Sequence, residues 1–97
     1  MIQDANQMEA NNPIYLPYIS AADFEAFRVL MKDEIAPTFQ EWLNRRSERI
    51  ALYYSTPGII EVYVNPKDFS AFCSANSRGR DGRALLDFAE MTGKAKR

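Results

Sequence analysis

The sequence predicts a small, mainly helical α+β domain with about four helices and one clear β-strand at residues 59–64. Most apolar residues recur at three- and four-residue spacing, which is typical of amphipathic helices. Residues 59–64 instead read Ile-Ile-Glu-Val-Tyr-Val, a run of β-branched and aromatic side chains. A single strand leaves backbone donors and acceptors unpaired, so it requires a partner. We expect that partner either within the chain or in a second copy, across a homodimer.

The chain has 97 residues, of which 46% are hydrophobic and 12% aromatic, enough to form one packed domain. We place that domain at residues 13–93. Residues 1–12 are rich in Asn and Gln and show no periodicity, so we expect a disordered lead there. Residues 94–97 form a basic tail.

The first part of the domain is expected to be extended. Pro13 and Pro17 lack an N–H group and forbid a central strand, but they permit an edge segment. Ser20 can then cap a helix that we expect to end near Glu34. The apolar stripe of this helix consists of Phe24, Phe27, Leu30 and Met31.

The next helix begins at Pro37 or Thr38, where Thr38 and Glu41 could form a capping box. Its stripe contains Phe39, Trp42, Leu43, Arg46 and Ile50. Residues 49–54 also fit a strand, because their apolar side chains alternate and a Pro-Gly turn follows. We favour the helix for this segment and leave the strand open.

Two more helices follow the strand. Asn65 can cap a helix that has Pro66 in its first turn and ends by Asn76. Residues 77–83 form a polar loop, within which Asp81 can cap a last helix. We expect Gly93 to stop that helix.

Charge and composition narrow the class of protein. The net charge is −1, with seven acidic and two basic residues in 1–44 and ten basic and six acidic residues in 45–97. A nearly neutral total argues against a protein that coats nucleic acid. There is no apolar run long enough to cross a membrane and no signal peptide pattern. With a single cysteine, the sequence favours a cytoplasmic protein with no membrane association.

No catalytic pattern is complete. The chain has no histidine, which removes the commonest general base and metal ligand. Cys73 lies on an apolar helix stripe with no base beside it, so we interpret it as a core residue. The carboxylates lack the spacing of a metal site. We therefore expect no enzyme activity, cofactor or metal.

The function that remains is binding to another protein. We interpret the chain as a small interaction or regulatory module that forms a homodimer. It could also bind a different protein as its partner. Tyrosine suits interfaces, because its ring is apolar and its tip polar. The candidate interface residues are Ile59, Glu61, Tyr63, Tyr15, Tyr18, Tyr53 and Tyr54.

Two other functions stay open. The order strand, capped helix, loop and helix is similar to a ribbon-helix-helix protomer, which binds DNA as a dimer. In that case Arg78, Arg80 and Arg83 would contact phosphate or another anion. Glu61 argues against DNA, because it would lie in the negative major groove. The third function is a small-ligand binder, or an enzyme whose motif is unfamiliar.

Overall fold

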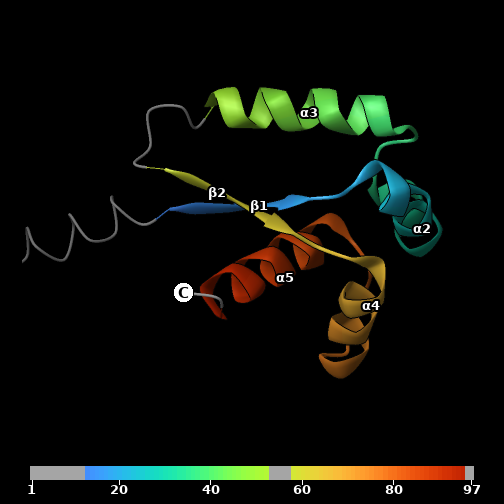
Figure 1. Ribbon diagram of the computed structural model, residues 1–97. Coiled ribbons are helices and arrows are strands. Elements are labelled where there is room, and N and C mark those ends of the chain that lie inside the picture. Colours follow the sequence, from blue (N-terminus) through green and yellow to red (C-terminus); the bar gives the residue numbers. More distant parts are fainter. Residues whose placement is uncertain (1–12, 53–57, 96–97) are drawn as a thin grey trace, which may run out of the picture.

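The computed structural model describes residues 13–52 and 58–95 and confirms the α+β class, with four α-helices and a two-stranded sheet. Figure 1 shows α3 on one side of the two strands and α5 on the other. The elements in order are β1 (Ile14–Tyr18), α2 (Ala21–Met31), the short 3-10 helix η1 (Lys32–Glu34), α3 (Phe39–Leu52), β2 (Ile59–Tyr63), α4 (Pro66–Ala75) and α5 (Gly82–Ala95).

The strand at residues 59–63 finds its partner within the chain. It pairs in parallel with β1, so that Ile14 lies opposite Ile59 and Tyr18 lies opposite Tyr63. Parallel neighbours need a long crossover, and α2, η1 and α3 provide it here. The two-proline segment predicted to be an edge is therefore one of the two strands.

Four side chains begin helices where the sequence predicts them to. The hydroxyls of Ser20 and Thr38 accept hydrogen bonds from the backbone N–H groups of residues 23 and 41, at 3.2 and 3.1 Å. Asn65 Oδ1 accepts from the N–H of residue 68 at 2.8 Å, and Asp81 Oδ1 from that of residue 84 at 2.8 Å. Each cap satisfies a donor that the first helical turn leaves unpaired.

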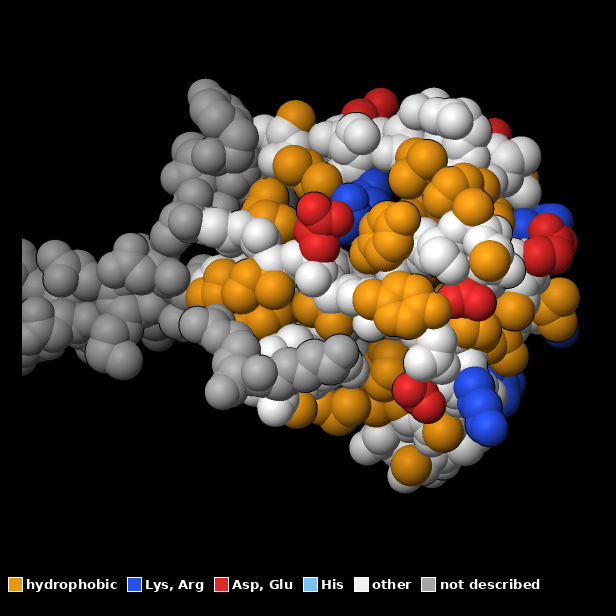
Figure 2. All heavy atoms as spheres, viewed as in Figure 1, with side chains coloured by type: hydrophobic (Ala, Val, Ile, Leu, Met, Phe, Trp, Pro, Cys, Tyr) orange, Lys and Arg blue, Asp and Glu red, His pale blue; other side chains and the backbone are white. Residues whose placement is uncertain are grey.

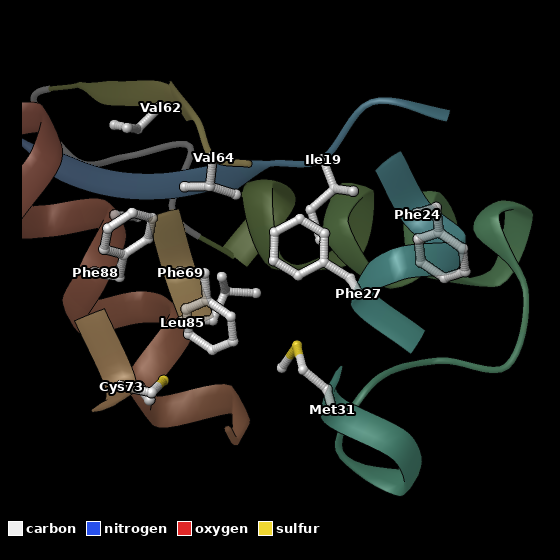
Figure 3. Packing of buried hydrophobic residues seen from close by; sticks show 12 residues of the cluster. Ile19, Phe24, Phe27, Met31, Val62, Val64, Phe69, Cys73, Leu85 and Phe88 are labelled. Carbon is white, nitrogen blue, oxygen red and sulfur yellow. The ribbon is translucent and has the colours of Figure 1, made fainter. Parts of the chain in front are cut away.

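The core lies between one face of the sheet and the helices α2, α4 and α5. Phe27 and Phe69 are completely buried and their ring centroids are 5.7 Å apart, while Phe88 lies 5.9 Å from Phe69. Figure 3 shows these rings below Val62 of β2 and Val64, which follows that strand. Ile19, Phe24, Met31, Cys73, Ala84, Leu85 and Ala89 complete the buried cluster.

Helix α3 is attached differently, because none of its residues is buried. At its first turns Phe39 and Trp42 pack against Phe24, with ring centroids 5.5 and 6.3 Å away. Further along, Arg46 reaches the sheet: its Nε donates to the carbonyl of Pro17 at 3.1 Å and its Nη2 to Glu61 at 2.7 Å. The helix is therefore held by two aromatic rings and one arginine.

Two boundaries need comment. Residues 49–52 are helical, as favoured, because α3 continues to Leu52. The expectation that Gly93 ends the last helix is wrong, since α5 continues to Ala95. Gly93 is buried against β1 and β2, and a Cβ there would lie 2.8 Å from Tyr15 Cε1 and 2.9 Å from Val62 Cγ2. The glycine permits close packing of a helix on a sheet and does not stop the helix.

The predictions for residues 1–12, for Tyr53 and Tyr54, and for the last two residues of the basic tail lie outside the described residues.

Candidate functional site

The outer edge of β2 has no neighbouring strand among the described residues. Peptide groups along a strand point alternately to its two edges. Val64 donates to the carbonyl of Tyr18, and Gly58 accepts from the N–H of Ile14. The N–H and C=O groups of Ile59, Glu61 and Tyr63 therefore point away from β1. Among the described residues, they have no backbone partner on that side.

The outer edge of β1 is different, because its sequence leaves few backbone groups that could pair with another strand. By the same alternation, Pro13 and Pro17 face outward, and neither has an N–H group to donate. The outward carbonyl of Pro17 already accepts a hydrogen bond from Arg46. Prolines, and carbonyl groups that already accept a hydrogen bond, protect strand edges from pairing with other chains. The sheet thus has one protected edge and one edge that is open for pairing.

Exposed apolar side chains lie beside the open edge. Tyr63 is 49% exposed and Tyr18, its register partner on β1, is 38% exposed. Met91 of α5 is also 49% exposed and lines a cavity of about 530 Å³ together with Tyr63, Phe72 and Phe88. In Figure 2 hydrophobic side chains run across the middle of the visible face, with a few charged groups among them. This band follows the region where Figure 1 places β2.

The side chains at this edge are held in place by their own chain. The hydroxyl of Tyr63 donates to Asp23, and this hydrogen bond raises the pKa of the Tyr63 phenol above its usual value. The guanidinium of Arg46 lies 5.6 Å from the centroid of the Tyr18 ring and binds Glu61. An ordered surface loses less entropy when it binds a partner.

The structure divides the predicted interface residues into three groups. Tyr18, Glu61 and Tyr63 are exposed around the open edge, and Ile59 is half-buried at its start. Tyr15 lies on the opposite face of the sheet, where its ring meets Gly93 of α5. It therefore belongs to the packing of the domain more than to its surface. Tyr53 and Tyr54 lie outside the described residues.

The three arginines of the loop do not form one site. Arg78 binds Asp87 at 2.7 Å, and Arg83 binds the other oxygen of the same carboxylate at 3.3 Å. Arg78 thereby holds the pKa of Asp87 below its usual value. Arg80 points instead to Ser70 of α4. Arg78 of the loop and Arg83 of α5 itself therefore share one carboxylate near the start of α5.

The described residues hold no group of three or more potential metal ligands, and none of the described helices is long and apolar enough to cross a membrane. Cys73 is buried, and its burial raises the pKa of the thiol. A thiol with a raised pKa is a poor nucleophile.

Sequence reasoning missed two residues of this site. Arg46 occupies a position in the apolar stripe of α3, where a charged side chain is a signal that it reaches a polar partner. Met91 is an apolar residue of the last helix, and about half of its surface is exposed. Only the path of α5 past the strand brings it to the edge.

Models of protein families, curated protein sequences and solved structures were each compared with the chain, and none of them matches.

Proposed function

We propose that this protein is a small, non-enzymatic interaction module that forms a homodimer by pairing the open edges of two β2 strands. The observation that supports the proposal is the row of outward peptide groups at Ile59, Glu61 and Tyr63. Exposed strand edges pair readily with other strands unless they are blocked. The exposed rings of Tyr18 and Tyr63 add apolar area beside that row.

Symmetry restricts how two such edges can meet. A two-fold axis brings the same surface of both copies together, so the two β2 strands run antiparallel. Pairing Glu61 with Glu61 of the second copy would place like charges opposite each other, which destabilises a sheet. A shift of two residues places Glu61 opposite Tyr63 of the second copy and avoids the conflict. We expect this second register.

The asymmetry between the two edges of the sheet also favours a dimer over a longer assembly. In the pair, the four strands follow the order β1, β2, β2 and β1, so both outer edges belong to β1. Those edges carry Pro13 and Pro17 and the capped carbonyl of Pro17. Because the remaining edges are protected, pairing ends at two copies.

The cytoplasm is the location that we propose for this module. Its only cysteine is a free, buried thiol, which is compatible with a reducing compartment. DNA binding is not proposed, because Glu61 points to α3, where it binds Arg46, and β2 already pairs with β1. Both features differ from a strand that is free to enter a groove of DNA.

Light scattering coupled to size exclusion would test the dimer over a range of protein concentrations. The variant that tests the open edge is Glu61→Pro, which removes an outward N–H group from the middle of β2. Glu61→Ala is the matched control, because it removes the same ion pair with Arg46 but keeps the N–H. A proline at Val62 would be uninformative, since the N–H of Val62 faces β1.

The proposal expects a dimeric mass for the wild type and for Glu61→Ala, and a monomeric mass for Glu61→Pro. Circular dichroism checks that the proline variant keeps its helices. A wild type that stays monomeric at all concentrations would overturn the proposal. A folded Glu61→Pro variant that stays dimeric would also overturn it, since the interface would then lie elsewhere.

A further inference from the structure

Four arginines line a hollow beside β1: Arg45, Arg46, Arg49 and Arg83. The hollow is lined by β1, by the segment from the end of α2 to Ala36, by α3 and by the start of α5, and its volume is about 410 Å³. A smaller cavity of about 260 Å³ adjoins it and shares four of its lining residues. Leu16, Arg49, Arg83 and Leu86 are those shared residues.

The floor of this hollow is apolar. Leu16 of β1, Met31 at the end of α2 and Leu85 of α5 are almost fully buried there, and Trp42 of α3 forms part of the wall. The hollow exists because α3 does not pack on β1 through apolar side chains. Small-molecule sites in proteins are usually concave, mostly apolar and 300–1,000 Å³ in size, with a few convergent polar groups.

Arginines supply those polar groups. Arg45, Arg46, Arg49 and Arg83 line the larger cavity, and Glu34 is the single carboxylate among its lining residues. Arg46 is committed to Pro17 and Glu61. Within the described part of the chain, Arg45 and Arg83 each form one ion pair, with a carboxylate of their own helix at 3.4 and 3.3 Å. Such exposed pairs are weak and exchange easily with a ligand.

Arg49 is the exception within this group. Among the described residues it has no hydrogen-bond or ion-pair partner, and both cavities are lined by it. The two carboxylates of the smaller cavity are already occupied, Asp87 by Arg78 and Arg83, and Glu90 by Lys94 at 2.8 Å. The positive charge of Arg49 is therefore available to a ligand.

We propose that this hollow binds a small amphipathic carboxylate, with its apolar body on the floor and its carboxylate between Arg49 and Arg83. A guanidinium matches a carboxylate through two parallel hydrogen bonds, which makes arginine well suited to this role. The apolar floor explains why a fully hydrated anion would gain less here. The site is independent of the proposed dimer, because it lies at the edge of β1 and the dimer uses the edge of β2.

The single tryptophan of the chain provides the readout, because Trp42 lines the hollow. Decanoate, titrated below its micelle concentration, is the probe. Acetate supplies the same charge without the apolar body, and decyltrimethylammonium supplies the apolar body with the opposite charge. We expect decanoate alone to change the emission of Trp42 saturably, and isothermal calorimetry to give the same dissociation constant.

Two substitutions locate the site. Arg49→Gln removes the unpaired charge and should weaken decanoate binding about tenfold, which is the effect of losing one charge-assisted contact. Arg80→Gln is the matched control, because it makes the same change at an exposed arginine outside the hollow and should leave binding unaltered. No saturable response to decanoate by either method would overturn the proposal. Equal binding of decyltrimethylammonium, or unchanged binding by Arg49→Gln, would overturn it as well.

Discussion

Helices α3 and α5 have the same length of 14 residues and lie on opposite faces of the same small sheet, yet they are attached in different ways. Five residues of α5 are buried, whereas α3 has none. Helix α5 can approach the strands closely because Gly93 has no side chain to separate them. Helix α3 meets the sheet through the long side chain of Arg46.

This difference has a functional consequence. A face closed by apolar packing stabilises the domain but leaves little space for a ligand. Helix α3 is bridged to the sheet by an arginine, and the cavity lined by Leu16, Trp42 and Arg49 lies beside this bridge, between α3, β1 and the start of α5. The cavity that we propose as a binding site therefore lies beside the helix with the weaker apolar attachment.

The largest effect is expected where α5 touches the strands. Gly93→Ala adds a methyl group that would lie less than 3 Å from Tyr15 and Val62, so the helix must move away from the sheet. The steric overlap should cost about 3 kcal/mol and the gain in helix propensity should return about 1 kcal/mol, so we expect a net fall of about 2 kcal/mol in the free energy of unfolding. Urea denaturation followed by circular dichroism measures the change.

Gly82→Ala is the control for this prediction, because it makes the same change in the same helix. Nothing lies within 4 Å of a Cβ at Gly82, and the described glycines have no positive φ. This variant should be neutral or slightly stabilising. If Gly93→Ala proved as stable as Gly82→Ala, close packing of α5 on the sheet would not be the reason for the glycine.

A smaller effect is expected on the opposite face. Arg46→Ala removes the hydrogen bond to the Pro17 carbonyl, the ion pair with Glu61 and the contacts with two aromatic rings. Because Glu61 is exposed and its charge is screened, we expect a loss of about 1–2 kcal/mol. The same urea experiment gives the value.

Arg45→Ala makes the same change one residue earlier and should alter stability by no more than about 0.5 kcal/mol, since its pair with Glu41 is exposed. Equal losses in the two variants would mean that α3 is not held by Arg46, and the contrast between the two faces would no longer stand.

The same contrast explains how far the sequence could predict the fold. Caps depend on a few neighbouring residues, so Ser20, Thr38, Asn65 and Asp81 could each be placed in advance. The role of Gly93 could not be predicted, because glycine is typical both of helix ends and of close contacts between a helix and a sheet. The contact with Tyr15, which is far away in the sequence, distinguishes the two roles.

The candidate site was predicted only in part, for a similar reason. Alternation in residues 59–64 indicated which side chains share a face, and Tyr63 and Glu61 are indeed exposed. The parallel partner of the strand depends on a crossover of three helical segments, which no local pattern specifies. The hollow beside β1 is lined by residues from four separate segments. The spacing of residues along the chain does not predict that these segments lie close together.

The smallest effect concerns the charged start of α5 and appears only as a dependence on pH. Contacts with Arg78 and Arg83 lower the pKa of Asp87 in the folded protein. Their stabilisation is therefore fully present above the unfolded pKa of about 4 and is lost as the pH falls through the lowered folded value. Asp87→Asn should be less stable than the wild type at pH 7, and this difference should be smaller near pH 2.

Urea midpoints at the two pH values measure this difference, and Glu25→Gln provides the control, because Glu25 forms an exposed pair on α2 far from α5. Its difference from the wild type should be close to zero at both pH values. A deficit of Asp87→Asn that persisted in full at pH 2 would show that Asp87 acts through packing. The start of α5 would then be held by packing, like the middle of the same helix, and not by charged contacts like those of α3.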